Sequence, residues 1–146
     1  MGTAANGTSP VVRTGVDIVS VARVARLATE DAGALGEVFT EEELAYCRRR
    51  PSSHQHLAVR FAAKEAVLKA FGTGIGKRMR WTDVEIAKER SGRPLVRLHG
   101  EVAAWAERRG LAGVDVSLSH SAGLAVAQAV SVWEQPQKDG DALPSD

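Results

Sequence analysis

The stretch of sequence that decides the fold is RFAAKEAVLKAFG, residues Arg60–Gly72. It predicts the last part of a helix that begins near His54 and ends at Phe71, with Gly72 as its stop signal. At about 100° per residue, four large apolar side chains of this helix fall on one face, so that face is expected to pack against a core. These side chains are Leu57, Phe61, Leu68 and Phe71.

Two charged side chains interrupt this apolar face, Lys64 in its middle and Glu65 at its edge. A charged group against a core is costly unless it is paired or bound to a metal. Two interpretations fit the pattern. Either Lys64 extends its ammonium group to solvent while Glu65 forms an ion pair on the helix surface, or both residues belong to a site that performs chemistry.

A third charged residue, Asp17, lies near the end of Val11–Val19, a β-branched stretch that predicts a buried strand. Its carboxylate either caps the helix that follows or binds a hard cation. Magnesium is typically held by one or two carboxylates, with water and phosphate oxygens completing its coordination. Asp17 and Glu65 would meet that need if the fold brings them together.

Two further segments are weaker signals. Residues 71–76, FGTGIG, hold three glycines that would let backbone N–H groups approach an anion, although helix termination alone explains Gly72. Residues 119–121, Ser-His-Ser, lie at the end of an expected strand. Neither a second His nor a Cys stands at metal-ligand spacing from His120, and the G-x-S-x-G turn of a nucleophilic serine is absent. An ordinary surface or core histidine is the simplest interpretation.

The rest of the sequence predicts short strands and helices around this helix. The expected strands are 11–19, 82–87, 95–98, 114–118 and 124–133. The expected helices are 21–28, 54–71 and 101–109, together with one that begins at a Thr40–Glu43 capping box and ends at Pro51. Residues 29–39 are expected to form a loop and 119–123 a turn. Helices mixed with antiparallel hairpins indicate a single α+β domain over 11–133, between flexible tails at 1–10 and 134–146.

Composition excludes several classes of protein. The chain has 146 residues and a formal net charge of +1, and its basic residues form only short runs, which does not favour a nucleic-acid partner. The single cysteine, Cys47, excludes an internal disulfide framework and a multi-Cys zinc site. Neither a signal sequence nor an apolar stretch of membrane-spanning length is visible. We therefore expect a cytoplasmic protein without a membrane partner.

Taken together and in this order, several segments resemble holo-[acyl-carrier-protein] synthases, the short class of 4'-phosphopantetheinyl transferases. These segments are Gly15–Val19 followed by Arg23, Arg60–Ala66 with Lys69, Phe71–Ile75, and Val116–His120. The resemblance covers roughly Val11–Trp133 and is most specific from Phe61 to Gly74. It implies the α+β fold of that family, with a mostly antiparallel sheet packed against helices.

The resemblance implies an activity as well. In this family a serine hydroxyl of an apo acyl carrier protein attacks the β-phosphate of coenzyme A, takes the phosphopantetheine arm and releases adenosine 3',5'-bisphosphate. Mg²⁺ is the expected cofactor and coenzyme A the co-substrate. A magnesium site built from carboxylates, with lysines beside it for the pyrophosphate, would serve such a transfer by positioning the reactants and neutralising charge.

Roles for individual residues follow from the same resemblance. Asp17 and Glu65 match the Mg²⁺ ligands, and the catalytic positions are Glu65, Lys64 and His120, with Glu65 or a metal-bound water favoured over Lys64 as the general base. The positions that match contacts to coenzyme A are Arg60, Lys64, Lys69, Gly72, Thr73, Gly74, Ile75, His120 and Ser121. In this family the histidine reaches the ligand from the neighbouring subunit, which implies a homotrimer.

Two departures from the family pattern bear on partners. The basic residues that often precede the Arg-Phe motif and hold the 3'-phosphate are replaced by Ser52–Gln55, with a basic run displaced to Arg48–Arg50. Arg23 and Arg26 match the carrier-protein docking surface, but Glu30 and Asp31 follow them. The alternative function is a module that binds coenzyme A without catalysis. A small RNA-associated protein is a third class, which the aromatic content of 5% does not favour.

Overall fold

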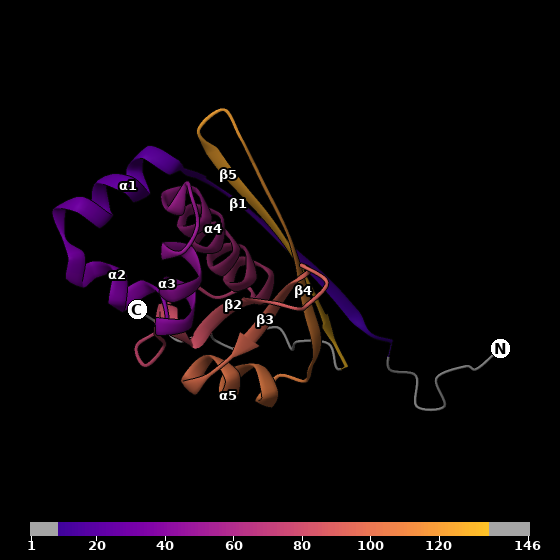
Figure 1. Cartoon of the computed structure of the whole chain (residues 1–146). Helices are drawn as coiled ribbons and strands as arrows, with labels where there is room; N and C mark the ends of the chain where they lie inside the picture. The colour runs from indigo at the N-terminus through magenta and orange to yellow at the C-terminus, as the bar shows by residue number, and fades with distance from the viewer. Residues whose placement is uncertain (1–8, 135–146) are drawn as a thin grey trace.

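The structure, a computed structural model, describes residues 9–134, and over that range it holds five α-helices and five strands (Figure 1). In chain order the elements are β1 (Val11–Ser20), α1 (Val21–Glu30), α2 (Ala32–Val38), α3 (Glu41–Arg48), α4 (Ser53–Phe71), the 3-10 helix η1 (Trp81–Asp83), β2 (Val84–Lys88), β3 (Pro94–Leu98), α5 (Gly100–Arg108), β4 (Leu111–Ser121) and β5 (Leu124–Trp133).

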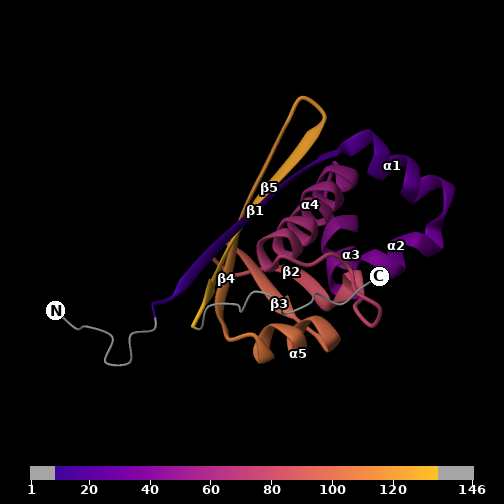
Figure 2. The same ribbon diagram turned by 180° about the vertical axis from the view of Figure 1, so that it is seen from behind.

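The strands form two antiparallel sheets. The larger one has the order β1-β5-β4, and the smaller one is the β2–β3 hairpin. In the larger sheet the register places Asp17 opposite Ala127 and His120 opposite Ala125. In both views the helices lie to one side of this sheet, with α4 alongside β1 and β5 (Figures 1 and 2).

Small residues let α4 approach the sheet closely. Ala125, Ala127 and Ala129 of β5 are completely buried under the helix. On β1, a Cβ atom added to Gly15 would lie 2.2 Å from the carbonyl oxygen of Ala66 in α4. The strand therefore runs in near-contact with the helix backbone, which fixes where the next inward-facing residue, Asp17, meets α4.

Three aromatic rings pack together at the C-terminal end of α4. Phe71 lies 5.3 Å from the ring of Trp133 and 6.1 Å from that of Trp105, and the two tryptophan rings are 6.0 Å apart. Such edge-to-face and stacked contacts add to the burial of apolar area. They tie the C-terminal end of α4 to α5 and β5.

The opposite face of the larger sheet exposes several large apolar side chains among polar ones. Val12, Val16, Ile18 and Leu124 all point away from the helices and are between 45% and 61% exposed. Exposed contiguous apolar surface of this kind is typical of a surface that contacts another protein.

The predicted α+β class is confirmed, and most of the expected elements are present. Residues 29–39 were expected to be a loop, which is wrong, because most of them form α2. The side chain of Asp31 accepts hydrogen bonds from the backbone N–H groups of Gly33 and Ala34 and so caps this helix. The first residues of the expected strand 82–87 instead complete η1.

The last hairpin is also tighter than expected. The turn expected over 119–123 contains only Ala122 and Gly123, both with positive φ, so β4 continues to Ser121.

Helix α4 is buried nearly all round rather than along one face, because the sheet, α1, α3 and β2 surround it. Most of the two expected tails, residues 1–8 and 135–146, lies outside the described residues. Over residues 9–134, every helix is too short or too polar to cross a membrane.

Candidate functional site

Asp17 and Lys69 form the first contact between the predicted site residues. Lys69 Nζ lies 2.9 Å from Asp17 Oδ1 and donates a second hydrogen bond of 3.2 Å to the carbonyl oxygen of Val16. The Asp17 side chain is 12% exposed, whereas that of Lys69 is 54% exposed. The carboxylate is thus mostly buried, while the ammonium group paired with it is more than half exposed. Capping of α1 falls to Ser20, whose hydroxyl accepts from the N–H of Arg23, so Asp17 is not the helix cap.

Glu65 lies one turn before Lys69 on α4 and belongs to the same group. Burial raises the pKa of its carboxyl, and the nearby charge of Asp17 raises it further, while the charges of Lys69 and Arg23 act in the opposite direction. The two carboxylates are therefore near enough to repel each other. A lysine beside such a pair reduces that repulsion, and a divalent cation between the two would remove it.

The donor set fits a magnesium ion. Over the described residues, His, Cys, Asp and Glu form no cluster of three or more that is suited to a metal. Two carboxylates leave most coordination positions to water and to phosphate oxygens, which is how Mg²⁺ is usually bound together with a phosphorylated substrate. Asp17 and Glu65 are the residues that would hold it.

The first helix borders this group. Arg23 of α1 is near enough to Glu65 for its charge to affect the pKa of that carboxyl. Arg23 and Arg26 also line a groove of about 320 Å³ whose other walls are mainly apolar. The remaining residues along the groove are Val19, Val24, Leu27, Glu30, Val38, Phe39, Phe61 and Trp81.

The glycine-rich segment continues directly from α4 at the end where Lys69 lies. Gly72 adopts a left-handed conformation with φ of 79°, which ends the helix and turns the chain. Thr73 is buried, and its hydroxyl donates to the carbonyl oxygen of Gly74. Gly74 is exposed and Ile75 is half-buried, so these two residues are the accessible part of the segment.

Lys64 is inside the protein, which does not fit its predicted role in binding coenzyme A phosphates or in catalysis. Its side chain is fully buried, and its Nζ donates to Glu43 Oε1 at 2.8 Å, to the carbonyl oxygen of Trp81 at 3.2 Å and to that of Val84. These three acceptors match the three donors of an ammonium group, so none remains for a phosphate. The alternative that this side chain extends to solvent is also wrong.

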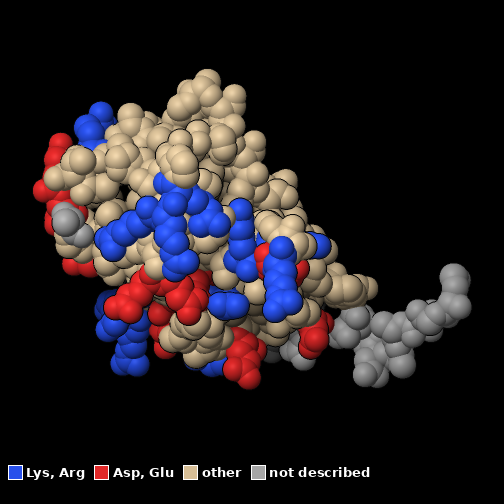
Figure 3. Space-filling view, in the orientation of Figure 1, with Lys and Arg blue, Asp and Glu red and all other residues tan. Residues whose placement is uncertain are grey.

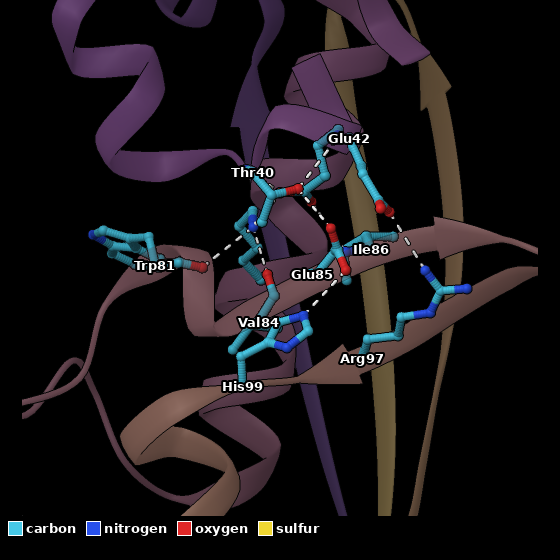
Figure 4. A network of polar contacts seen from close by, with 10 residues as sticks. Thr40, Glu42, Trp81, Val84, Glu85, Ile86, Arg97 and His99 are labelled. Atoms are coloured by element: carbon cyan, nitrogen blue, oxygen red, sulfur yellow. Dashed lines mark hydrogen bonds and ion pairs between the residues drawn. The ribbon is translucent and has the colours of Figure 1, made fainter. Parts of the chain in front are cut away.

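Lys64 belongs to a polar network that joins α3, α4 and the β2–β3 hairpin (Figure 4). Glu43 Oε1 also accepts from the N–H of Thr40, and Glu43 Oε2 accepts from the N–H of Ile86. The hydroxyl of Thr40 donates to Glu85, whose other oxygen lies 3.1 Å from His99 Nε2. The capping box expected from the sequence is therefore present, and its glutamate has a second function as the partner of Lys64.

Arg60 and His120 form a second group, on another side of α4. Arg60 lies about 140° around the helix from Glu65. Together with His120 it lines a cavity of about 500 Å³ between α4, the β2–β3 hairpin and β4. Ser121 is exposed at the end of β4, next to His120. Within one chain, the predicted ligand-binding residues thus divide between the Asp17–Glu65–Lys69 group and the Arg60–His120 group.

Sequence reasoning did not identify the residues around Arg60 as part of a site. Tyr46 and Arg50 lie four residues apart at the end of α3, and they meet Lys88 of β2 there. The run Arg48–Arg50 was noticed only as a displaced basic segment. Nothing in the local pattern around Lys88 distinguishes it from any surface lysine.

Comparisons with known proteins agree with this geometry. A family model described as the 4'-phosphopantetheinyl transferase superfamily matches residues 13–128. The holo-[acyl-carrier-protein] synthase of Ruminiclostridium cellulolyticum is 47% identical over 118 residues, which are 80% of this chain and 88% of the relative.

Solved structures give the same result. The holo-[acyl-carrier-protein] synthase of Neisseria meningitidis has a TM-score of 0.75 at 33% identity, covering 82% of this chain and 96% of that one. The Helicobacter pylori enzyme of the same name, solved in complex with coenzyme A, has a TM-score of 0.70 at 31% identity, and the match covers 81% of this chain and 98% of that one. The match extends over nearly all of the described residues, and the chain belongs to the 4'-phosphopantetheinyl transferase superfamily.

Proposed function

We propose that this chain is a holo-[acyl-carrier-protein] synthase that requires Mg²⁺. The oxygen of a carrier-protein serine bonds to the β-phosphorus of coenzyme A, and the bond from that phosphorus to the bridging oxygen of the pyrophosphate breaks. Adenosine 3',5'-bisphosphate leaves with the bridging oxygen, and the proton of the serine goes to a base. The carrier protein then holds the phosphopantetheine arm as a phosphodiester.

The observation that carries this proposal is the grouping of Asp17 of β1 with Glu65 and Lys69 of α4. Asp17 and Glu65 supply two carboxylates, and Lys69 supplies a cation 2.9 Å from Asp17 that is still 54% exposed. When bound there, Mg²⁺ would neutralise the charge of the pyrophosphate. The exposed Lys69 ammonium can turn from Asp17 toward a phosphate oxygen without leaving a buried charge unpaired.

We assign the proton of the serine to Glu65 rather than to Lys64. The Lys64 ammonium is enclosed by three acceptors and has no route to a substrate. Glu65 is only half-buried and belongs to the same group as Asp17 and Lys69, so its carboxylate is the better placed of the two to accept a proton. The accessible backbone of Gly74 and Ile75 would lie along the adenosine end of the ligand, beside Lys69.

The division of the site residues into two groups supports a homotrimer. His120 and Ser121 lie with Arg60 on another side of α4 from Asp17 and Glu65, so they would reach the coenzyme A bound there only from a neighbouring subunit. The exposed apolar face of β1 and β5, with Val12, Val16 and Ile18, offers a surface for that contact. In this arrangement each site combines the magnesium group of one subunit with the Arg60–His120 group of the next.

The carrier protein would dock on α1. Arg23 and Arg26 provide positive charge beside an apolar groove, and Arg23 also lies near Glu65. An acidic helix placed there would bring its serine toward the carboxylates, since charge complementarity favours both encounter and orientation. We also infer a cytoplasmic location.

The direct test is the intact mass of an apo acyl carrier protein after incubation with the purified chain, coenzyme A and Mg²⁺. We expect a gain of one phosphopantetheine arm, which EDTA abolishes and added Mg²⁺ restores. Glu65→Gln should fold normally and lose nearly all transfer, whereas Glu107→Gln, which alters an exposed carboxylate on α5, should not change the rate. Tight coenzyme A binding without product on carriers from several pathways would favour the non-catalytic module instead.

A further inference from the structure

Ser131 differs from the other residues that β5 (Leu124–Trp133) directs toward α4, because it alone among them carries a hydroxyl. Residues 116–133 contain neither Lys, Arg, Asp nor Glu, and Figure 3 shows none of these residues over the projecting end of the β4–β5 hairpin. An ion pair from β5 to α4 is therefore excluded, which leaves hydrogen bonding. The inward-facing residues of β5, all completely buried, are Ala125, Ala127, Ala129, Ser131 and Trp133.

The hydroxyl of Ser131 binds the last turn of α4. It donates to the carbonyl oxygen of Ala70 at 3.2 Å, and the carbonyl oxygen of Arg13 in β1, at 3.4 Å, is the more distant acceptor for the same proton. Trp133 Nε1 donates to Ser131 Oγ at 2.9 Å. Because the indole N–H occupies one lone pair of the hydroxyl oxygen, it restricts the direction of the hydroxyl proton. A chain of two hydrogen bonds therefore runs from Trp133 through Ser131 to the end of α4.

The carbonyl group of Ala70 lacks a partner inside its own helix. The last four carbonyl groups of any helix are left without an intrahelical donor. The N–H groups of Gly72 and Thr73 donate to the two carbonyl oxygens that precede that of Ala70, and within residues 9–134 the backbone supplies no donor for Ala70 itself. Ala70 is 1% exposed, and a buried carbonyl without a donor is costly. Ser131 thus completes the C-terminal cap that Gly72 begins.

This last turn of α4 carries residues that the proposed function assigns to coenzyme A. Lys69 lies in it, and Gly72–Ile75 continue directly from it. The other end of that glycine-rich segment is held separately, because Met79 Sδ accepts from the N–H of Gly76 at 3.4 Å. A shift of the last turn would therefore displace Lys69 and the first glycines of the segment, whereas Glu65, one turn earlier, would keep its place.

We propose that Ser131 is a positioning residue for the binding of coenzyme A. Its hydroxyl, oriented by Trp133, fixes the last turn of α4 so that Lys69 and the glycine-rich segment are already arranged to receive the phosphates of the ligand. Groups that are ordered in advance reduce the free-energy cost of binding, so loss of the hydroxyl weakens binding more than it slows the chemical step. This inference rests on the proposed function and adds to it a role for a residue buried in the core.

The first test is a series of substitutions at Ser131, followed by the rate of carrier modification at varied concentrations of coenzyme A. Ser131→Ala is expected to raise the KM for coenzyme A about tenfold, as for one weakened charge-assisted hydrogen bond, and to change kcat by less than about twofold. Ser131→Thr and Ser131→Val have nearly the same shape but differ in the hydroxyl. We expect Ser131→Thr to retain the KM of the unchanged chain and Ser131→Val to behave like Ser131→Ala.

A loss of stability has to be separated from a loss of positioning. Leu35→Ala removes buried apolar atoms from α2, which packs mainly on α1 and η1, and it should lower the urea concentration at which the chain unfolds. At a temperature where both variants are folded, Leu35→Ala should keep the KM of the unchanged chain. An equal rise of KM in Leu35→Ala and Ser131→Ala would show that Ser131 acts through stability alone, and would overturn the proposal.

Amide hydrogen exchange provides a readout that requires no ligand. The N–H groups of Gly72 and Thr73 bond to carbonyl oxygens of the last turn of α4, so they report on whether that turn opens. We expect both to exchange about tenfold faster in Ser131→Ala and Ser131→Val, but not in Ser131→Thr. The N–H of Gly76, which has its own acceptor, is the internal reference and should exchange at an unchanged rate.

Ligand binding without a carrier protein distinguishes this proposal from the proposed function. Adenosine 3',5'-bisphosphate is titrated calorimetrically into the unchanged chain and into Ser131→Ala, each with Mg²⁺. Weaker binding and faster exchange in Ser131→Ala would support the positioning role, even if the mass assay showed no product, a result that would count against the proposed function alone. Equal affinities in the unchanged chain and Ser131→Ala would overturn the proposal, whatever the exchange rates.

Discussion

Glu43 and Lys64 form an ion pair that is sealed from solvent, with 2.8 Å between Oε1 and Nζ and no more than 1% of either side chain exposed. The pair joins the first turn of α3 to the middle of α4, and its further hydrogen bonds extend to the start of β2. It sets the rotation of α4 about its axis. Because Lys64 points inward, the next residue, Glu65, is directed toward β1 and Asp17.

Breaking this pair should be costly. Lys64→Met leaves the Glu43 carboxylate buried without its cation, and we expect a loss of about 3–5 kcal/mol in the free energy of unfolding, measured by urea denaturation. The double variant Glu43→Gln, Lys64→Met leaves no buried charge and should lose less than the two single variants together. Additive losses would show that the two residues act independently.

Gly15 should tolerate no side chain. In Gly15→Ala the new Cβ would fall 2.2 Å from the Ala66 oxygen and 2.6 Å from the Ala70 nitrogen, so β1 must move away from α4. We expect a destabilisation of about 1–3 kcal/mol or more and weaker Mg²⁺ activation, because Asp17 moves with the strand. Gly113→Ala, where no atom lies within 4 Å of the added Cβ, is the control for both measurements. Equal effects of the two substitutions would contradict this account of β1 packing.

Lys69 is expected to contribute to ligand binding and little to stability. The Lys69 side of its ion pair with Asp17 is exposed to solvent, where such pairs contribute little to stability, so Lys69→Gln should unfold at nearly the same urea concentration. The KM for coenzyme A should rise about tenfold, the effect of losing one charge-assisted hydrogen bond to a phosphate. An unchanged KM would remove Lys69 from the binding site.

Glu85 should make part of the stability depend on pH. Burial acts to raise the pKa of its carboxyl, but hydrogen bonds with Thr40 and His99 and the charges of His99 and Arg97 outweigh burial, and the pKa is lowered. The stabilisation is therefore complete above the unfolded-state pKa of about 4.3 and is lost as the pH falls through the lower folded-state value. Glu85→Gln should lower stability at neutral pH and approach the unchanged protein in acid. Urea midpoints that differ equally at pH 3 and 7 would contradict this.

The sequence predicted Asp17, Glu65 and Lys69 as one group, which the structure brings together, and it predicted Arg60 and His120 but not the residues packed around Arg60. Glu65 and Lys69 are one helical turn apart, so helical spacing alone places them together, and a carboxylate near the end of a β-branched strand identifies Asp17. Lys64 was misassigned because its partner Glu43 lies 21 residues away, and no local pattern shows that a packed helix will cover an ammonium group.

The cluster around Tyr46 depends even more on tertiary packing. Arg50 and Arg60 approach the ring from the end of α3 and from α4, but Lys88 arrives only because β2 packs beside α3. Helix α2 was missed for a different reason. Only its capping residue, Asp31, separates α2 from α1. In the sequence, two helices separated by one residue look like one irregular polar segment.

Alternate residues of strand β1 face two different environments, helix α4 on one side and the outer face of the sheet on the other. Gly15, Asp17 and Val19 face α4, while Val12, Val16 and Ile18 face outward. Inserting or deleting one residue before Asp17 would exchange the two sets, placing the carboxylate on the outward face and Val16 or Ile18 beside Glu65 and Lys69. Natural relatives should therefore vary in the identity of the outward residues but not in the length of this strand.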